Sequence, residues 1–195
     1  MDLPLSVLSQ IAAILERVGI RYVLVGSFAS SIHGMYRSTA DIDILAEIKP
    51  EHVTPLFEAL RDCCYVDEQA MREAVERRRS FNAIHFDSVF KVDFFVLKSD
   101  EFAVTQLNRR QLRKVSPDRE EAVYVATAED TVLAKLKWYR AGNETSTTQW
   151  NDVVGILGTS FESLDLDYLQ FWSDKLSLTD LLKRALEDAG NEAGR

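Results

Sequence analysis

The sequence predicts an α/β (α+β) fold in which a mixed, twisted sheet is flanked by helices and followed by a C-terminal helical bundle. Two observations lead to this prediction. Short apolar runs typical of strands recur up to residue 126, and stretches with helical spacing separate them. Beyond residue 127 the patterns are all helical. We therefore expect a core domain over residues 1–126 and a helical subdomain over 127–195, packed on that core.

The first half of the chain alternates helical and strand patterns. Apolar residues at helical spacing, ended by Gly19, predict a helix over 5–18. Two strand-like runs surround Asp87-Ser88 and predict a hairpin. The expected strands are 21–25, 41–46, 81–86, 90–97 and 122–126, and the other expected helices are 28–35, 51–61, 67–79 and 100–113.

The second half begins with a helix start signal. Thr127 is a typical N-cap, and Glu129 and Asp130 place negative charge in the first turn, where the helix dipole favours it. The helices expected from here on are 128–140, 147–157, 165–174 and 178–189.

Composition limits the classes of function. The chain has 195 residues, 46% of them hydrophobic, which is enough for a packed core. Lys and Arg total 23 and Asp and Glu total 31, so the net charge of −8 argues against a broad surface that coats nucleic acid. Cys63 and Cys64 are adjacent and are expected to be free thiols in a reducing compartment. With no signal peptide or membrane-spanning run in the sequence, we expect a cytoplasmic protein.

One segment, residues 25–44, combines several features that suit phosphate and metal chemistry. It reads VGSFASSIHGMYRSTADIDI, so a strand ends in Gly26-Ser27 and a helix follows at once. Gly26 permits a sharp turn and a close approach to a phosphate, and Ser27 can donate to a phosphate oxygen at the helix start. Ser27 can equally cap that helix. Asp41 and Asp43 are two residues apart on a strand, so their side chains point to the same side and can hold the same hard divalent cations.

Asp93 is a third candidate carboxylate. It lies in Lys91-Val92-Asp93-Phe94-Phe95, an otherwise apolar strand where a charge is costly unless it is paired or metal-bound. Asp93 could complete the metal site and accept a proton from an attacking hydroxyl. The alternative is that Asp93 pairs with a buried Lys or Arg.

These motifs resemble the nucleotidyltransferase superfamily of the DNA polymerase beta type. The hallmark of that superfamily is Gly-Ser or Gly-Gly, a helix, Asp-x-Asp and a later third Asp. More closely, the chain looks like the bacterial abortive-infection and toxin (AbiEii-like) nucleotidyltransferases, which carry an Arg-x-Thr-x-Asp-hydrophobic-Asp run. The stretch from Arg37 through Thr39 to Asp43 matches that run.

The C-terminal half resembles the same branch more loosely. Glu129-Asp130, Lys135 and Arg140 are similar to its Glu-Asp and Lys motif. Gln149-Trp150-Asn151-Asp152 is similar to its Arg-Asp motif but lacks the Arg, which leaves the role of Asp152 open. The resemblance implies that Lys135 contacts the triphosphate, with Lys137 as the fallback. An exposed helix charge is the other interpretation of Lys135.

The resemblance implies the transfer of a nucleoside monophosphate from an NTP to an acceptor hydroxyl. Asp41, Asp43 and Asp93 would hold two Mg²⁺ ions. Gly26, Ser27, Thr39 and Lys135 would bind the nucleotide, with Arg37 assisting or pairing with the aspartates. The acceptor implied by the resemblance would be a tRNA, a protein or a small molecule, and a toxin with a cognate antitoxin is one implied role. The alternative is a catalytically silent protein that keeps the fold and acts as a binding or antitoxin-like partner. A homo-oligomer formed through the C-terminal bundle is compatible with the enzyme.

Overall fold

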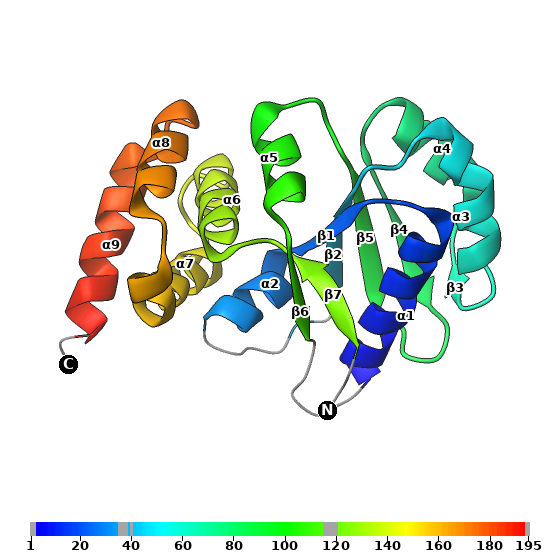
Figure 1. Ribbon diagram of the computed structural model, residues 1–195, viewed down its shortest axis with the longest axis horizontal. Helices are drawn as coiled ribbons and strands as arrows, with labels where there is room; N and C mark the ends of the chain where they lie inside the picture. Colours follow the sequence, from blue (N-terminus) through cyan, green and yellow to red (C-terminus); the bar gives the residue numbers. More distant parts are fainter. Residues whose placement is uncertain (1–2, 35–38, 40, 115–120, 194–195) are drawn as a thin grey trace. The chain divides into compact units, whose positions relative to one another are not determined.

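The computed structural model describes residues 3–34, 39, 41–114 and 121–193 (Figure 1). The chain forms two compact units. The first consists of Met1–Ser27 and Ser38–Ala126, and the second of Phe28–Arg37 and Thr127–Arg195. This division groups Phe28–Arg37 with the C-terminal helices. The division between the units falls directly after Gly26-Ser27.

Within the described residues of the first unit, seven strands form one mixed sheet in the order β3-β4-β5-β2-β1-β7-β6. β2 runs parallel to β5 and β1 parallel to β7, while the other neighbouring pairs are antiparallel. The strands are β1 (Tyr22–Val25), β2 (Asp41–Ala46), β3 (Cys64–Tyr65), β4 (Ser80–His85), β5 (Lys91–Val96), β6 (Gln111–Lys114) and β7 (Ala122–Val125).

The helices of this unit cover the two faces of the sheet differently. α1 (Leu3–Val18), α3 (Val53–Leu60) and α4 (Glu68–Glu76) lie next to one another on one side (Figure 1). A short 3₁₀ turn, Pro50–His52, precedes α3. The other face carries α5 (Glu101–Arg109), whose Leu107 packs on Val23 and Leu45. Because strand side chains alternate between faces, Ile44 and Phe94 point to the α1 side, and both are fully buried.

The second unit is helical. Its helices are α6 (Ala128–Ala141), α7 (Thr147–Ser160), α8 (Leu166–Lys175) and α9 (Thr179–Ala193), with the 3₁₀ turn Phe161–Ser163 between α7 and α8. The predicted N-cap is confirmed, since the Thr127 side chain accepts from the Asp130 amide. α2 (Gly26–His33) joins this unit at its end, where the His33 carbonyl accepts from the Thr159 hydroxyl at 2.8 Å.

The α/β fold class and the hairpin of β4 and β5 are confirmed. Two strands differ from the expectation. The predicted helix 100–113 ends at Arg109, and Gln111–Lys114 pairs with β7 as β6. Its side chains are all exposed and give no strand periodicity, because β6 is the edge strand of the sheet. The two-residue β3 is too short to leave a pattern. No described helix has the length and apolarity needed to cross a membrane.

Candidate active site

Asp41, Asp43 and Asp93 lie on one face of the sheet, where β2 and β5 run side by side in parallel. Asp43 is the direct neighbour of Asp93 and Asp41 is the direct neighbour of Lys91. Adjacent strands are about 4.8 Å apart, and residues two apart on one strand share a face. These four residues therefore form a two-by-two grid of three carboxylates and one ammonium group.

The grid lies on the same face of the sheet as α5. The next row inward is Leu45 beside Phe95, against which α5 rests. The exposed fraction of the side chains then rises along this face, away from α5. The Asp93 side chain is 20% exposed, and that of Asp41, one row further out, is 53% exposed. The charged grid therefore begins where the apolar cover of the sheet ends, which leaves it open on one side.

Gly26 brings the Gly-Ser turn into direct contact with Asp43. Val25 is the register partner of Asp43, and Gly26 follows it with φ +65°. A Cβ at Gly26 would lie 2.0 Å from Asp43 Oδ2, far inside contact distance. The position therefore requires glycine for its backbone conformation and for the space that the carboxylate occupies. The first turn of α2, predicted to bind phosphate, starts beside a predicted metal ligand.

Lys91 is paired with two of the carboxylates. Its Nζ lies 2.7 Å from Asp93 Oδ2 and 3.8 Å from Asp41 Oδ1. The hydrogen bond to Asp93, together with the charges of Asp93, Asp41 and Asp43, raises the pKa of Lys91 above its ordinary value. Lys91 is therefore a cation at neutral pH, and it neutralises part of the charge of the grid. The sequence had left open that Asp93 pairs with a buried Lys or Arg. The structure pairs Asp93 with Lys91, whose side chain is 42% exposed.

The grid fits a divalent cation by residue type and by backbone register. Carboxylate oxygens are the ligands that Mg²⁺ prefers, and one or two of them suffice when substrate and water complete its shell. Among the described residues, no three His, Cys, Asp or Glu side chains are gathered closely enough to hold a metal ion. Asp41 and Asp93 instead face the ammonium of Lys91. A metal ion held by Asp93 would take the place of the Lys91 ammonium.

The predicted nucleotide-binding residues have different surroundings. Ser27 lies in the first turn of α2. The Thr39 hydroxyl donates to the carbonyl of Asp41 at 3.3 Å, directly before β2 begins. Arg37 lies outside the described residues. The segment that leads into β2 thus has Gly26 and Ser27 at its start and Thr39 near its end.

Lys135 belongs to the second unit and is buried there. Its Nζ lies 2.7 Å from Asp152 Oδ2 and donates to Gln149 Oε1 at 3.1 Å. The interpretation of Lys135 as an exposed helix charge is therefore wrong, because only 5% of its side chain is accessible. Lys137, the fallback, is exposed. The structure joins the two looser C-terminal motifs through this ion pair.

Two residues of the carboxylate face were not singled out from the sequence. One is Lys91, and the other is Asn82 on β4, the direct neighbour of Asp93 on the side away from Asp43. Asn82 is exposed. The signal for Lys91 was available, since it lies two positions before Asp93 on the same strand. Asn82 could be found only through the hairpin register.

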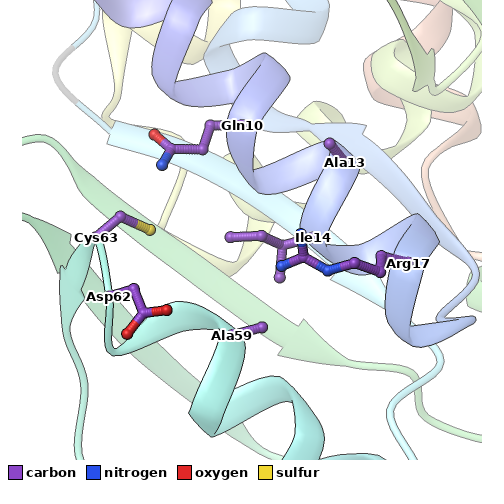
Figure 2. A pocket seen from close by; sticks show the side chains of 7 residues that line it. All are labelled: Gln10, Ala13, Ile14, Arg17, Ala59, Asp62 and Cys63. Carbon is purple, nitrogen blue, oxygen red and sulfur yellow. The ribbon is translucent and has the colours of Figure 1, made fainter.

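A cavity of about 250 Å³ lies elsewhere, between α1 and the end of α3 (Figure 2). Arg17, Asp62 and Cys63 are among the side chains that line it. α1 packs on the opposite face of the sheet, where its Glu16 accepts from the Tyr22 hydroxyl. This cavity is therefore separate from the carboxylate grid.

The sheet, the Gly-Ser turn at the end of β1 and the aspartates on β2 and β5 agree with the nucleotidyltransferase class that the sequence resembles. The family model described as "Nucleotidyltransferase of unknown function (DUF6036)" matches residues 5–169. The chain belongs to this family. A search of curated proteins found no match.

Solved structures with the same fold cover most of the chain. An antigenic nucleotidyltransferase-like protein from Paracoccidioides brasiliensis is 16% identical over 94% of this chain and 91% of its own, with a TM-score of 0.57. The antibiotic-resistance factor ANT(2'')-Ia is 10% identical over 98% of both chains, also at 0.57. The lincosamide antibiotic adenylyltransferase LnuA, solved with lincomycin bound, is 16% identical over 76% of this chain and 93% of its own, at 0.51. At these identities the likeness shows the fold, and the predicted fold class is confirmed.

Proposed function

We propose that this protein transfers a nucleoside monophosphate from an NTP to an acceptor hydroxyl and releases pyrophosphate. The observation that supports this most directly is the contact between the Gly26 turn and Asp43, with Asp93 beside Asp43 in register. In that arrangement the turn proposed to bind phosphate adjoins the proposed metal ligand Asp43, which in turn adjoins the proposed proton acceptor Asp93. Family membership supports the same reaction class.

Each residue has a role that follows from its position. Asp41 and Asp43 would hold two Mg²⁺ ions, and Asp93 would share one of them and take the proton of the attacking hydroxyl. Bound Mg²⁺ neutralises charge on the triphosphate and on the attacking and leaving oxygens. Gly26 and Ser27 would orient the phosphates at the start of α2. Thr39, Arg37 and Lys135 are proposed to assist in nucleotide binding.

We favour a small-molecule hydroxyl as the acceptor over a tRNA or a protein. The net charge of −8 disfavours a wide contact with a polyanion. Two proteins of similar fold support the same choice, since LnuA is a lincosamide antibiotic adenylyltransferase and ANT(2'')-Ia is an antibiotic-resistance factor. A role as a toxin with a cognate antitoxin remains a prediction from the sequence, as do the cytoplasmic location and the homo-oligomer.

The test is incubation of the protein with each α-³²P-labelled NTP and Mg²⁺, with a hydroxyl-bearing antibiotic panel, total tRNA and cell lysate as separate acceptors. We expect label in the small-molecule fraction and a loss of at least about 100-fold in the Asp41→Asn, Asp43→Asn double variant. Label in RNA or in protein would contradict the small-molecule acceptor and identify that macromolecule as the acceptor instead. Transfer that survives in the double variant would contradict the assignment of the site.

The catalytically silent alternative gives a different result in the same samples. Calorimetry with Mg²⁺-NTP would then show no binding at millimolar nucleotide, and no acceptor would be labelled. Tight binding without transfer to any acceptor would support a nucleotide-binding partner protein instead of an enzyme.

A further inference from the structure

We propose that Lys91 is a built-in counter-cation of the carboxylate grid, which competes with divalent metal ions for Asp93. This inference rests on the proposed function, because it concerns the same carboxylates. It assigns a role to a residue that the reaction scheme above does not use.

The face of the sheet on which Lys91 lies is fixed by the backbone and does not depend on one side-chain conformer. Lys91 is the register partner of Asp41 and stands two residues before Asp93 on β5. Both relations place its side chain on the face that carries the carboxylates. The ammonium then lies 2.7 Å from Asp93 and 3.8 Å from Asp41, so it contacts one carboxylate from each strand.

The charge pattern explains why a cation is needed there. Three carboxylates on neighbouring positions repel one another when no counter-ion lies between them. Asp43 is held close to the others, and its Oδ2 occupies the space that a Cβ at Gly26 would fill. Lys91 relieves the repulsion without an external ion. A divalent cation that uses Asp93 as a ligand takes over this role, and Lys91 must then leave Asp93 Oδ2.

The Lys91 side chain is able to leave. It is 42% exposed, whereas the Asp93 side chain is 20% exposed. Its long flexible stem can swing toward solvent, while Asp93 stays on the sheet. The exchange therefore requires a rotation of Lys91 and no change in the strands.

The test uses Mn²⁺ as a probe of the site. Electron paramagnetic resonance titration without nucleotide gives the dissociation constant for the wild-type protein, for Lys91→Met and for Lys91→Arg. Methionine keeps most of the length of the stem and removes the charge. We expect Lys91→Met to bind Mn²⁺ about fivefold more tightly. A change of this size in the dissociation constant corresponds to the loss of a strong, partly exposed ion pair between Lys91 and Asp93. Lys91→Arg should bind like the wild type, since it keeps the cation.

Lys98→Met is the matched control. Lys98 is exposed and lies two residues beyond the end of β5, so the variant has the same change in net charge without touching the grid. Its Mn²⁺ affinity should equal that of the wild type. A second readout is thermal unfolding. The Lys91→Met protein without metal should melt below the wild type, and Mn²⁺ should raise its melting temperature by more.

Two failures can be told apart. Equal Mn²⁺ affinity of the wild type and Lys91→Met, with binding lost in the Asp41→Asn, Asp43→Asn variant, would overturn the role of Lys91 and leave the proposed function standing. Mn²⁺ binding that survives in the Asp41→Asn, Asp43→Asn variant would place the metal elsewhere and overturn the proposed site together with this inference.

Discussion

Lys135 Nζ and Asp152 Oδ2 lie 2.7 Å apart, with only 5% and 9% of the two side chains accessible. A buried ion pair of this kind contributes little over a matched apolar pair, but breaking it leaves one charge buried without its counter-ion. The structure thus gives Asp152, whose role the sequence left open, a defined partner. Any contact of Lys135 with a triphosphate would have to weaken this pair or use its remaining N–H donors.

The first prediction concerns the removal of Asp152. Asp152→Asn should lower the free energy of unfolding by about 3 kcal/mol, because the Lys135 ammonium loses its carboxylate inside the helical unit. Urea denaturation would measure the loss. Glu58→Gln is the control, since its pair with Arg61 is 57–58% exposed and should contribute less than about 1 kcal/mol. Equal losses in both variants would show that Lys135 is solvated in solution.

Asp43 and Asp93 show which features of the site could be predicted from the sequence. Alternation along each strand predicted which face each carboxylate takes, because that relation is local. The pairing of β2 with β5 joins segments that are far apart in the sequence, and no local pattern encodes its register. The consequence is Lys91. Its place on the face of Asp93 follows from alternation within β5, whereas its place beside Asp41 emerges only once β2 and β5 are aligned.

The polar segments were harder to predict. β6 has four exposed side chains and no apolar alternation, and its strand conformation comes from pairing with β7. The burial of Lys135 has a similar origin. A lysine on a helix predicts an exposed charge unless a partner is known, and the partner belongs to the following helix.

A second prediction tests the contact between Gly26 and Asp43. Gly26→Ala should destabilise the protein by at least about 2 kcal/mol, because alanine is strained at φ +65° and its Cβ would displace the Asp43 carboxylate. Gly19→Ala is the matched control. Gly19 has φ +80°, but a methyl group there would meet nothing within 4 Å, so only the strain of about 1 kcal/mol remains. Equal losses in the two variants would remove the contact with Asp43 from the explanation.

The third prediction concerns the two thiols, whose sulfur atoms are 3.7 Å apart. Burial raises the pKa of Cys63 and, together with its neighbour, raises the pKa of Cys64 to about 12. Both thiols should therefore be protonated at pH 8, and DTNB should modify the native protein at least about tenfold more slowly than the unfolded chain. Cys63, which lines the cavity in Figure 2, should react before the buried Cys64.

The same shifts have a consequence for stability. A thiol whose pKa is raised by folding stabilises the native state fully below its unfolded pKa, which is 9.0 for these groups. The contribution is lost as the pH rises from there toward 12. Cys64→Ser should flatten the fall in the free energy of unfolding between about pH 9 and about pH 12, and an unchanged slope would contradict the raised pKa.

The last prediction concerns the acceptor side of the site. Asn82 is exposed and adjoins Asp93 on the side away from Asp43, so a hydroxyl that approaches Asp93 along the sheet passes its amide. Under the proposed function, Asn82→Ala should raise the KM for the labelled acceptor about fivefold, the effect of one lost hydrogen bond, and leave the Kd for Mg²⁺-NTP unchanged. Asn151→Ala, at an exposed helical position, is the control. A change in nucleotide affinity with an unchanged acceptor KM would place Asn82 on the nucleotide side of the grid and reverse the direction from which the acceptor enters.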